Sequence, residues 1–284
     1  LSFDMSVYRK ITTDQIVQAQ ISDASGFVDT RINSGKSENK GIELMLDLVP
    51  VRTADFQWDF IFAGAYNETK VLSLLTNKDG EKITVGTHVF NGEVRQVVGE
   101  EMGQIAGFGY KRDAIGQKIF GANGLPLRTP DLILFGSALP NWNGGFTNSF
   151  NYKGIMFSFL IDFKLGNMML SGTNFNAYRH GLHKVTLEGR EGGVVGDGVN
   201  EKGEPNTVHA PVQDYWSVVR SLALVEPIIY NGGYWKLRQI TVGYDFSKFF
   251  PTNSVIKGLT LNLVANNVLM LKKWVDNIDP ESFG

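Results

Sequence analysis

The chain contains no cysteine, which excludes a disulfide framework and any thiol chemistry. It also lacks an excess of either charge: the net charge is -2, so the composition gives no reason to expect a nucleic-acid partner. No stretch approaches the roughly 18 consecutive apolar residues that a membrane-spanning helix needs, and the mean hydropathy is only -0.10. Because no initiator methionine or signal peptide stands before Leu1, we expect the chain to be a segment of a longer precursor.

Glycine and aromatic residues, in contrast, are plentiful, with 32 glycines and 12% aromatics. The clearest pattern lies between Ile155 and Leu165, where every second residue is apolar: Ile155, Phe157, Phe159, Ile161, Phe163 and Leu165. The intervening residues become polar and then charged, ending in Asp162 and Lys164. This period of two predicts a strand. A large aromatic face without a polar atom suits contact with lipid, where a Lys or Arg at mid-bilayer costs about 2–4 kcal/mol.

The same alternation recurs around residues 3–7, 42–48, 56–66, 146–152, 240–246 and 259–264. Short connections at 50–54, 153–154 and 247–256 alternate with long ones at 11–38, 69–143 and 166–233. An up-and-down sheet would place every short turn at one end and every long loop at the other, which is typical of outer-membrane barrels. The predicted fold is therefore all-β, an antiparallel up-and-down transmembrane β-barrel segment with long extracellular loops.

One loop segment has a helical pattern. Residues 214–226 carry apolar side chains at helical spacing, with Asp214 as a candidate N-cap and Pro227 as a stop. We expect a short helix here, lying over the mouth of the barrel.

Particular motifs near the end of the chain resemble a known family. The segments NGGYWKLRQITVGYDFS from Asn231, KGLTLNLVANNVLML from Lys257 and DNIDPES from Asp276 follow one another, and NKGIELMLDL and LPNWNGGFTNSFNYKG occur earlier. In this order they are similar to the late barrel strands of the SusC/RagA-like TonB-dependent transporters of the Bacteroidetes outer membrane. In that family the strand carrying the equivalent of Asn266-Asn267 ends near this pair, and Asp279-Pro280-Glu281 falls in the next loop.

The resemblance implies that residues 1–284 form the carboxy-terminal part of a barrel of about 22 strands. The family's plug domain, TonB box and earlier barrel strands are not recognisable in this sequence. The implied function is TonB-dependent import of a bulky nutrient, an oligosaccharide or a peptide, across the bacterial outer membrane. The implied partners are a SusD-like lipoprotein lid, TonB and the lipid bilayer, and no cofactor is needed.

Aromatic and polar side chains in the long loops are the candidates for substrate binding, because flat apolar groups beside hydrogen-bonding groups suit sugars. The candidates are Phe108, Tyr110, Tyr178, Arg179, His209, Asp214, Tyr215 and Trp216. The charged residues Asp59, Asp162 and Lys164 are expected to face the lumen and to hold a plug or its water. The histidines lack the spacing of a zinc motif, and no arrangement supports an enzyme.

Other interpretations remain open at this point. The loop aromatics could simply pack the loops together. The chain could belong to a non-transporting outer-membrane barrel that displays its loops to a partner, or to a soluble β-sandwich with lectin-like loops.

Overall fold

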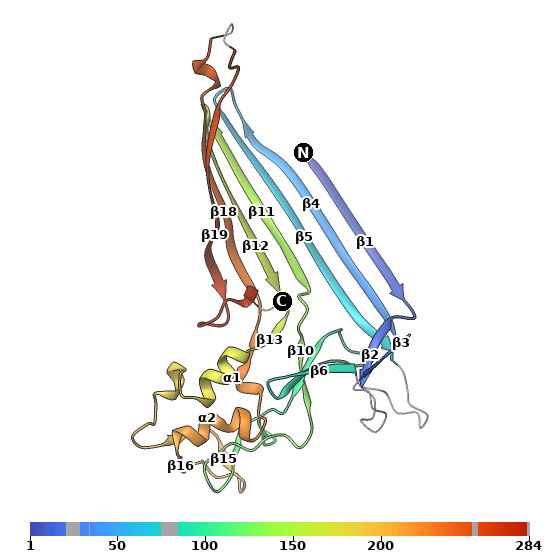
Figure 1. Ribbon diagram of the computed structural model, residues 1–284, viewed down its shortest axis with the longest axis vertical. Coiled ribbons are helices and arrows are strands. Elements are labelled where there is room, and N and C mark those ends of the chain that lie inside the picture. Colours follow the sequence, from blue (N-terminus) through green and yellow to red (C-terminus); the bar gives the residue numbers. More distant parts are fainter. Residues whose placement is uncertain (21–28, 34, 75–84, 252–254, 283–284) are drawn as a thin grey trace.

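The computed structural model describes residues 1–20, 29–33, 35–74, 85–251 and 255–282, and the side chains of 16–33 and 85–89 are outside this description. Its main feature is a seven-stranded antiparallel sheet (Figure 1). The strands, in their order across the sheet, are β1 (Ser2–Thr12), β4 (Lys36–Arg52), β5 (Phe56–Ser73), β11 (Trp142–Tyr152), β12 (Ile155–Leu165), β18 (Tyr234–Asp245) and β19 (Thr260–Lys273).

The sheet runs strictly up and down, since each strand pairs with the strands that precede and follow it in this order. The three short connections, β4 to β5, β11 to β12 and β18 to β19, all lie at one end, which we call the turn end (Figure 1). The three long connections lie at the opposite end, the loop end. The asymmetry predicted from connection lengths is therefore confirmed.

The hairpin between β11 and β12 shows how local sequence sets the register. Tyr152 pairs with Ile155, so only Lys153 and Gly154 form the loop, and both have positive φ, 51° and 93°. A two-residue turn with positive φ at both positions matches the right-handed twist of the strands that it joins. The bounds of β12, Ile155–Leu165, are those predicted. Strands β4 and β5 extend further than expected, leaving only residues 53–55 between them.

The two faces of the sheet differ as the alternation in β12 predicts. The apolar face consists of the six alternate residues of β12 from Ile155 to Leu165 and the residues in register with them across the neighbouring strands. It includes Phe157, which is 40% exposed, and Leu263, which is 71% exposed and is in register with Phe157 through Val242. Soluble monomers rarely expose contiguous apolar patches beyond a few hundred Å². Asn148 interrupts this face, but it is buried and accepts a hydrogen bond from Trp58 Nε1 at 3.0 Å. An apolar solvent therefore suits this face better than water does.

Strand β18 contains an irregularity that the sequence pattern did not indicate. The register shifts between Leu160 and Ile161 of β12, so that Gln239 and Leu237 pair with consecutive residues and Arg238 is the extra residue. Facing it in β19, Asn267 has a positive φ of 53°. The expected end of a strand near Asn266-Asn267 is wrong, because β19 continues to Lys273. A bulge of this kind re-aims a side chain locally.

Small elements fill the long connections at the loop end. Strands β2 (Ile16–Gln20) and β3 (Asp29–Asn33) form a hairpin, and β6 (Val85–Val89), β7 (Gly92–Gln96), β8 (Gln104–Gly107) and β10 (Ile133–Ser137) form a second sheet. Two-stranded pairings join β9 (Ile119–Phe120) to β15 (Val199–Asn200), β13 (Met168–Leu170) to β17 (Ile229–Asn231), and β14 (Val194–Val195) to β16 (His209–Ala210). The helices are α1 (Gly172–Arg179) and α2 (Val212–Ser221), with 3-10 turns η2 (Lys184–Thr186), η3 (Glu226–Ile228), η4 (Ser247–Phe249) and η5 (Pro280–Ser282).

The helix expected at 214–226 is present but displaced. Helix α2 begins at Val212 after Pro211, so Asp214 lies in its first turn and is not the N-cap; that assignment is wrong. The helix ends at Ser221, and Pro227 lies in η3. No sequence pattern indicated helix α1. Its N-cap is Ser171, whose side-chain oxygen accepts a hydrogen bond from the backbone N–H of Asn174.

The main buried cluster lies in the loop lobe, by which we mean the described parts of residues 85–141 and 166–233. Phe175 and Tyr178 of α1 pack there against Val219 of α2 and against Val225 and Ile228. Figure 1 shows this lobe gathered below the loop end of the sheet. The second sheet, formed by β6, β7, β8 and β10, lies at the loop end of the seven-stranded sheet (Figure 1), whereas a β-sandwich requires two sheets packed face to face. The soluble sandwich therefore lacks structural support.

No helix in the described part of the chain is long and apolar enough to cross a membrane.

Candidate functional site

The face opposite the apolar face carries the three charged residues expected to face a lumen. Asp162 and Lys164 alternate with the phenylalanines of β12, and Asp59 points to the same side because it pairs with Ser149, the partner of Ser158. We call this side the polar face. Asp59 lies towards the turn end of the sheet, whereas Asp162 and Lys164 lie near the loop end. That the polar face lines a lumen remains a prediction.

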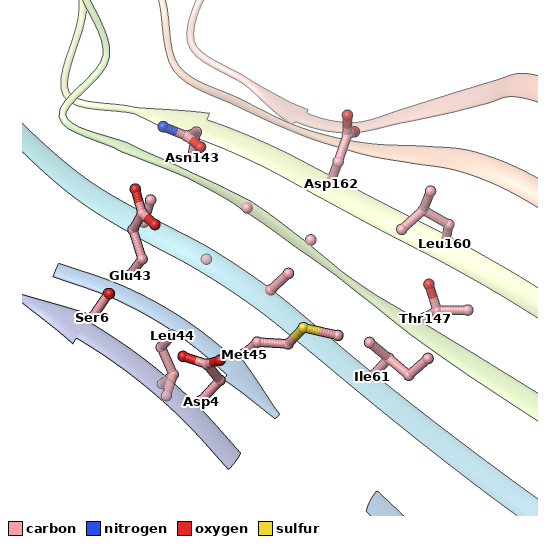
Figure 2. A pocket seen from close by; sticks show the side chains of 15 residues that line it. Asp4, Ser6, Glu43, Leu44, Met45, Ile61, Asn143, Thr147, Leu160 and Asp162 are labelled. Atoms are coloured by element: carbon pink, nitrogen blue, oxygen red, sulfur yellow. The ribbon is translucent and has the colours of Figure 1, made fainter. Parts of the chain in front are cut away.

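A hollow of about 770 Å³ crosses this face where small residues leave space (Figure 2). Its floor includes Ala63 and Gly145, which are register partners in β5 and β11. Carboxylates lie on both sides: Asp4 and Glu43 come from β1 and β4, and Asp162 comes from β12. One oxygen of Asp162, Oδ1, is buried and has no hydrogen-bond partner in the described part of the chain.

A network of ion pairs lies beside the hollow, built on the extra residue of β18. Arg238 donates two hydrogen bonds to Asp162 and a bidentate pair to Glu281 of η5, with Nη1 to Oε2 at 3.0 Å. Lys236 Nζ also donates to Glu281, and its side chain is only 9% exposed. Tyr234 donates its hydroxyl to the same carboxylate at 3.2 Å. The Asp-Pro-Glu motif thus folds back onto the barrel wall.

The segment that carries this glutamate also holds the loop lobe. Asn277 and Asn174 of α1 exchange side-chain hydrogen bonds, and Asn174 donates to the Tyr230 hydroxyl at 2.8 Å. The Tyr230 hydroxyl is in turn 2.9 Å from that of Tyr178. Val275 packs in the same region against Met169 and Tyr230, as does Ile278. Residues 274–282 therefore connect the polar face to the lobe.

Three of the predicted binding residues meet in the lobe. Tyr178 and Arg179 at the end of α1 and Trp216 of α2 line a cavity of about 500 Å³, which we call the loop cavity. Its other polar walls include His180, Thr186 and Arg190. Ligand sites for small molecules commonly occupy about 300–1,000 Å³. No local sequence motif indicates Thr186 or Arg190 as part of this site.

The loop cavity has distinctive polar groups. No aspartate or glutamate is among the described residues that line it. Trp216 Nε1 is buried, and no group in the described part of the chain accepts its proton. An unsatisfied buried N–H costs about 1–3 kcal/mol and calls for an explanation such as a bound group. Burial, followed by the hydrogen bond to Tyr230, raises the pKa of Tyr178, so this phenol stays neutral.

Phe108 and Tyr110 lie in the lobe but do not line the loop cavity. The Arg128 guanidinium lies over the Phe108 ring at 3.8 Å, and the Lys118 ammonium lies over the Tyr110 ring at 4.2 Å. One face of each ring is therefore already covered by a cation of the same chain, as expected for cation–π pairs.

The remaining loop candidates are also apart from the cavity. Tyr215 is buried in a small core with Phe120 and Ala210, which gives it a packing role. His209 is exposed, with Nδ1 2.9 Å from the Gly192 carbonyl oxygen, and Asp214 is exposed on α2.

Comparison with known proteins decides the family. The family described as TonB dependent receptor-like, beta-barrel matches residues 1–268. The chain belongs to this family. Its antiparallel sheet, with an apolar face and long connections at one end, is that of a transmembrane TonB-dependent barrel.

Individual relatives agree. TonB-dependent receptor P26 of Formosa agariphila is 29% identical over 98% of the chain, and TonB-dependent receptor SusC of Bacteroides thetaiotaomicron is 22% identical over 88%. A RagAB peptide importer structure in the closed-closed state covers 99% of the chain with a TM-score of 0.71 and 16% identity. The chain spans only 29% of the P26 sequence, 24% of the SusC sequence and 31% of the solved chain.

The TonB-dependent barrel family consists of receptors and transporters. Within the described part of this barrel chain, no group of three or more His, Asp or Glu residues is arranged to hold a metal ion. The side chain of His88 lies outside the described residues.

The environment of His183 predicts that the stability of the loop lobe depends on pH. His183 accepts a hydrogen bond at Nδ1 from the Val185 amide and stacks edge-on against Tyr178. Burial, then the charge of Lys184, lowers its pKa below 6.5, and Asp276 opposes this in part. The folded chain therefore binds fewer protons, so its stability is full above pH 6.5 and falls as pH decreases through 6.5 to the folded pKa.

We expect hydrogen exchange at the Val185 amide to accelerate as the pH is lowered from 6.5 to the pKa of His183 in the folded chain. The rates are first corrected for the intrinsic pH dependence of exchange. His183→Gln should remove the pH dependence, because glutamine does not titrate. An unchanged protection profile in the parent protein would contradict a role for His183 protonation.

Proposed function

We propose that this chain forms part of the wall and the extracellular loops of an outer-membrane transporter that imports a bulky nutrient with energy from TonB. The observation that carries the proposal is the match to the TonB-dependent receptor barrel family over residues 1–268. In this arrangement the apolar face contacts lipid, the polar face lines the lumen, and the loop end faces the outside of the cell. The protein resides in the outer membrane of a Gram-negative bacterium.

The geometry supports different roles for the loop lobe and for the strands of the barrel wall. The loop lobe has its own buried core and a cavity, so it can hold a ligand in a fixed position before transport. The hollow on the polar face provides room beside the wall for a plug domain or for passing substrate. Asp59, Asp162 and Lys164 then contact the plug or its water. No cofactor and no catalytic step are part of the proposal.

The proposed partners follow from the family. The intact protein would carry a plug and a TonB box, and a SusD-like lipoprotein would close over the loop end. The substrate would be an oligosaccharide or a peptide. Similarity to SusC, at 22% identity, and to a RagAB peptide importer, at 16% identity, supports these proposed partners.

Energised uptake tests the proposal directly. In cells that produce the intact protein, uptake of its substrate should cease when TonB is deleted, because plug rearrangement needs force from the inner membrane. Binding of the same substrate to the cell surface should persist. The measurement compares cell-associated and internalised label over time in the two strains.

The second candidate function is a non-transporting barrel that displays its loops to a partner. The ordered loop lobe would serve this role equally well. Uptake that does not depend on TonB, or a gene whose full product has neither plug nor TonB box, would favour display and would contradict transport.

A further inference from the structure

The loop cavity has an unbalanced charge. Arg179 and Arg190 both line it, yet neither guanidinium has a carboxylate within 4.0 Å in the described part of the chain. Arg190 uses Nε and Nη2 to donate to the Thr186 and Gly181 carbonyl oxygens, at 3.0 and 2.8 Å, which fixes the guanidinium at the wall. The Arg190 Nη1 atom has no hydrogen bond within the described residues.

Three of the other four arginines of the lobe have partners within it, and the fourth, Arg220, is exposed on α2 outside the cavity. Arg112 and Arg95 are each paired with a glutamate, and Arg128 covers an aromatic ring and donates to the Leu222 carbonyl. Among the described residues, the Arg179 guanidinium makes only a long contact to the Phe175 ring, at 5.7 Å. The cavity therefore gathers two guanidinium groups that have no anionic partner among the described residues, and a guanidinium is well suited to bidentate binding of a planar anion.

The aromatic side chains of the cavity indicate which kind of ligand fits it. Trp216 and Tyr178 lie 5.0 Å apart between ring centroids and both line the cavity, and Trp216 Nε1 is an N–H donor with no acceptor among the residues that the structure describes. His180, Thr186 and Gln213 add hydrogen-bonding groups. Aromatic faces beside side chains of this kind suit the apolar faces and hydroxyl edges of a sugar ring. Unpaired guanidinium groups suit an acidic substituent on that ring.

We propose that the loop cavity binds an acidic sugar residue of an oligosaccharide, with Arg179 and Arg190 receiving its carboxylate and Trp216 lining the ring site. This inference rests on the proposed function, because it names the substrate class of the same protein. The cavity then acts as a selectivity filter at the loop end, ahead of the lumen.

A matched pair of probes tests the charge requirement. Tetragalacturonic acid and its fully methyl-esterified form share one sugar skeleton and differ only in their carboxylates. Calorimetric titration into the intact protein in detergent should give affinity for the acid about tenfold or more above that for the ester. Rising ionic strength should weaken binding of the acid only. Tetraglutamate serves as an acidic peptide with no sugar ring.

Arg179→Gln is the decisive variant, because the Arg179 side chain makes no hydrogen bond to any described residue whose loss could unfold the lobe. It should lower affinity for the acid about tenfold and leave the ester unchanged. Arg190→Lys should act in the same direction. Arg220→Gln is the matched control, since Arg220 is exposed on α2 and lies outside the cavity.

Each outcome has a defined meaning. Equal affinity for acid and ester, an equal effect of Arg220→Gln, or tighter binding of tetraglutamate would overturn the acidic-sugar site. Uptake of the acid that persists without TonB would instead overturn the transport proposal and leave the binding site intact. Affinity for the acid that depends on Arg179, together with TonB-dependent uptake, would support both.

Discussion

Phe159→Arg is expected to prevent most of the protein from assembling into the outer membrane. Phe159 lies at the middle of β12 on the apolar face and packs against the rings of Phe150 and Phe157. Arginine on the lipid side of a barrel costs about 2–4 kcal/mol near the bilayer midplane, and the substitution also removes the aromatic contacts. Membrane-extracted protein and its heat-modifiable migration on gels measure the loss.

The adjacent residue provides the matched control. Ser158 lies directly before Phe159 in the middle of β12, but its side chain points to the polar face. Its register partners are Ser149 and Thr241. Ser158→Arg should therefore assemble far better than Phe159→Arg. Equal yields of the two variants in the membrane fraction would contradict the assignment of the apolar face to lipid.

Glu281→Gln is expected to release residues 274–282 from the barrel wall. Glutamine keeps the shape of the side chain but removes the charge that compensates Arg238 and the buried Lys236. Removing one member of a buried ion pair costs about 3–5 kcal/mol, and the lower end applies here because the Glu281 side chain is 27% exposed. Faster hydrogen exchange in peptides covering 274–282 measures the release.

The control for this prediction is Asp276→Asn in the same segment. Asp276 pairs with Lys184 at 3.2 Å, but both side chains are largely exposed, at 84% and 70%. Exposed ion pairs contribute little, so exchange in 274–282 should barely change. Similar acceleration in both variants would show that the segment responds to any charge loss and would contradict a specific role for Glu281.

The same ion pairs predict how the segment responds to acid. The hydrogen bond from Arg238, with Lys236 adding to it, lowers the pKa of Glu281 from 4.5 to about 2. The stabilisation is therefore complete above pH 4.5 and is lost as pH falls towards about 2. Exchange in 274–282 should stay slow at pH 5, where the His183 interaction is already weakening.

The strands could be predicted because the two faces of the sheet differ in polarity, which gives each strand a period of two. Alternation in β12 predicted its bounds and faces, and the Lys153-Gly154 turn predicted the hairpin. Connection lengths predicted which ends carry turns and loops. These signals are local, since a period of two and a turn residue can be read within about ten positions.

The loop lobe could be predicted only in part, because its stability comes from distant contacts. Helix α1 is short and packs Phe175 and Tyr178 against Val219 and Ile228, which lie in a different part of the same loop. The sequence pattern predicted a helix in this part of the loop but misplaced its start at Asp214. Of the predicted binding residues, Tyr178, Arg179 and Trp216 meet in one cavity, and Arg190 joins them without any local motif.

The amino-acid sequence by itself determined the strand pattern, the apolar and polar faces of β12 and the alternation of short and long connections. These features follow from side-chain period and turn chemistry, which act between neighbours in the chain. Only the tertiary structure decided that Arg238 is the extra residue of β18, that Glu281 returns to it from 43 positions away, and that two arginines line one cavity whose described walls carry no carboxylate. Such groupings depend on how the loops fold back onto the sheet. A pattern among neighbouring residues carries no information about contacts between residues so far apart in the sequence.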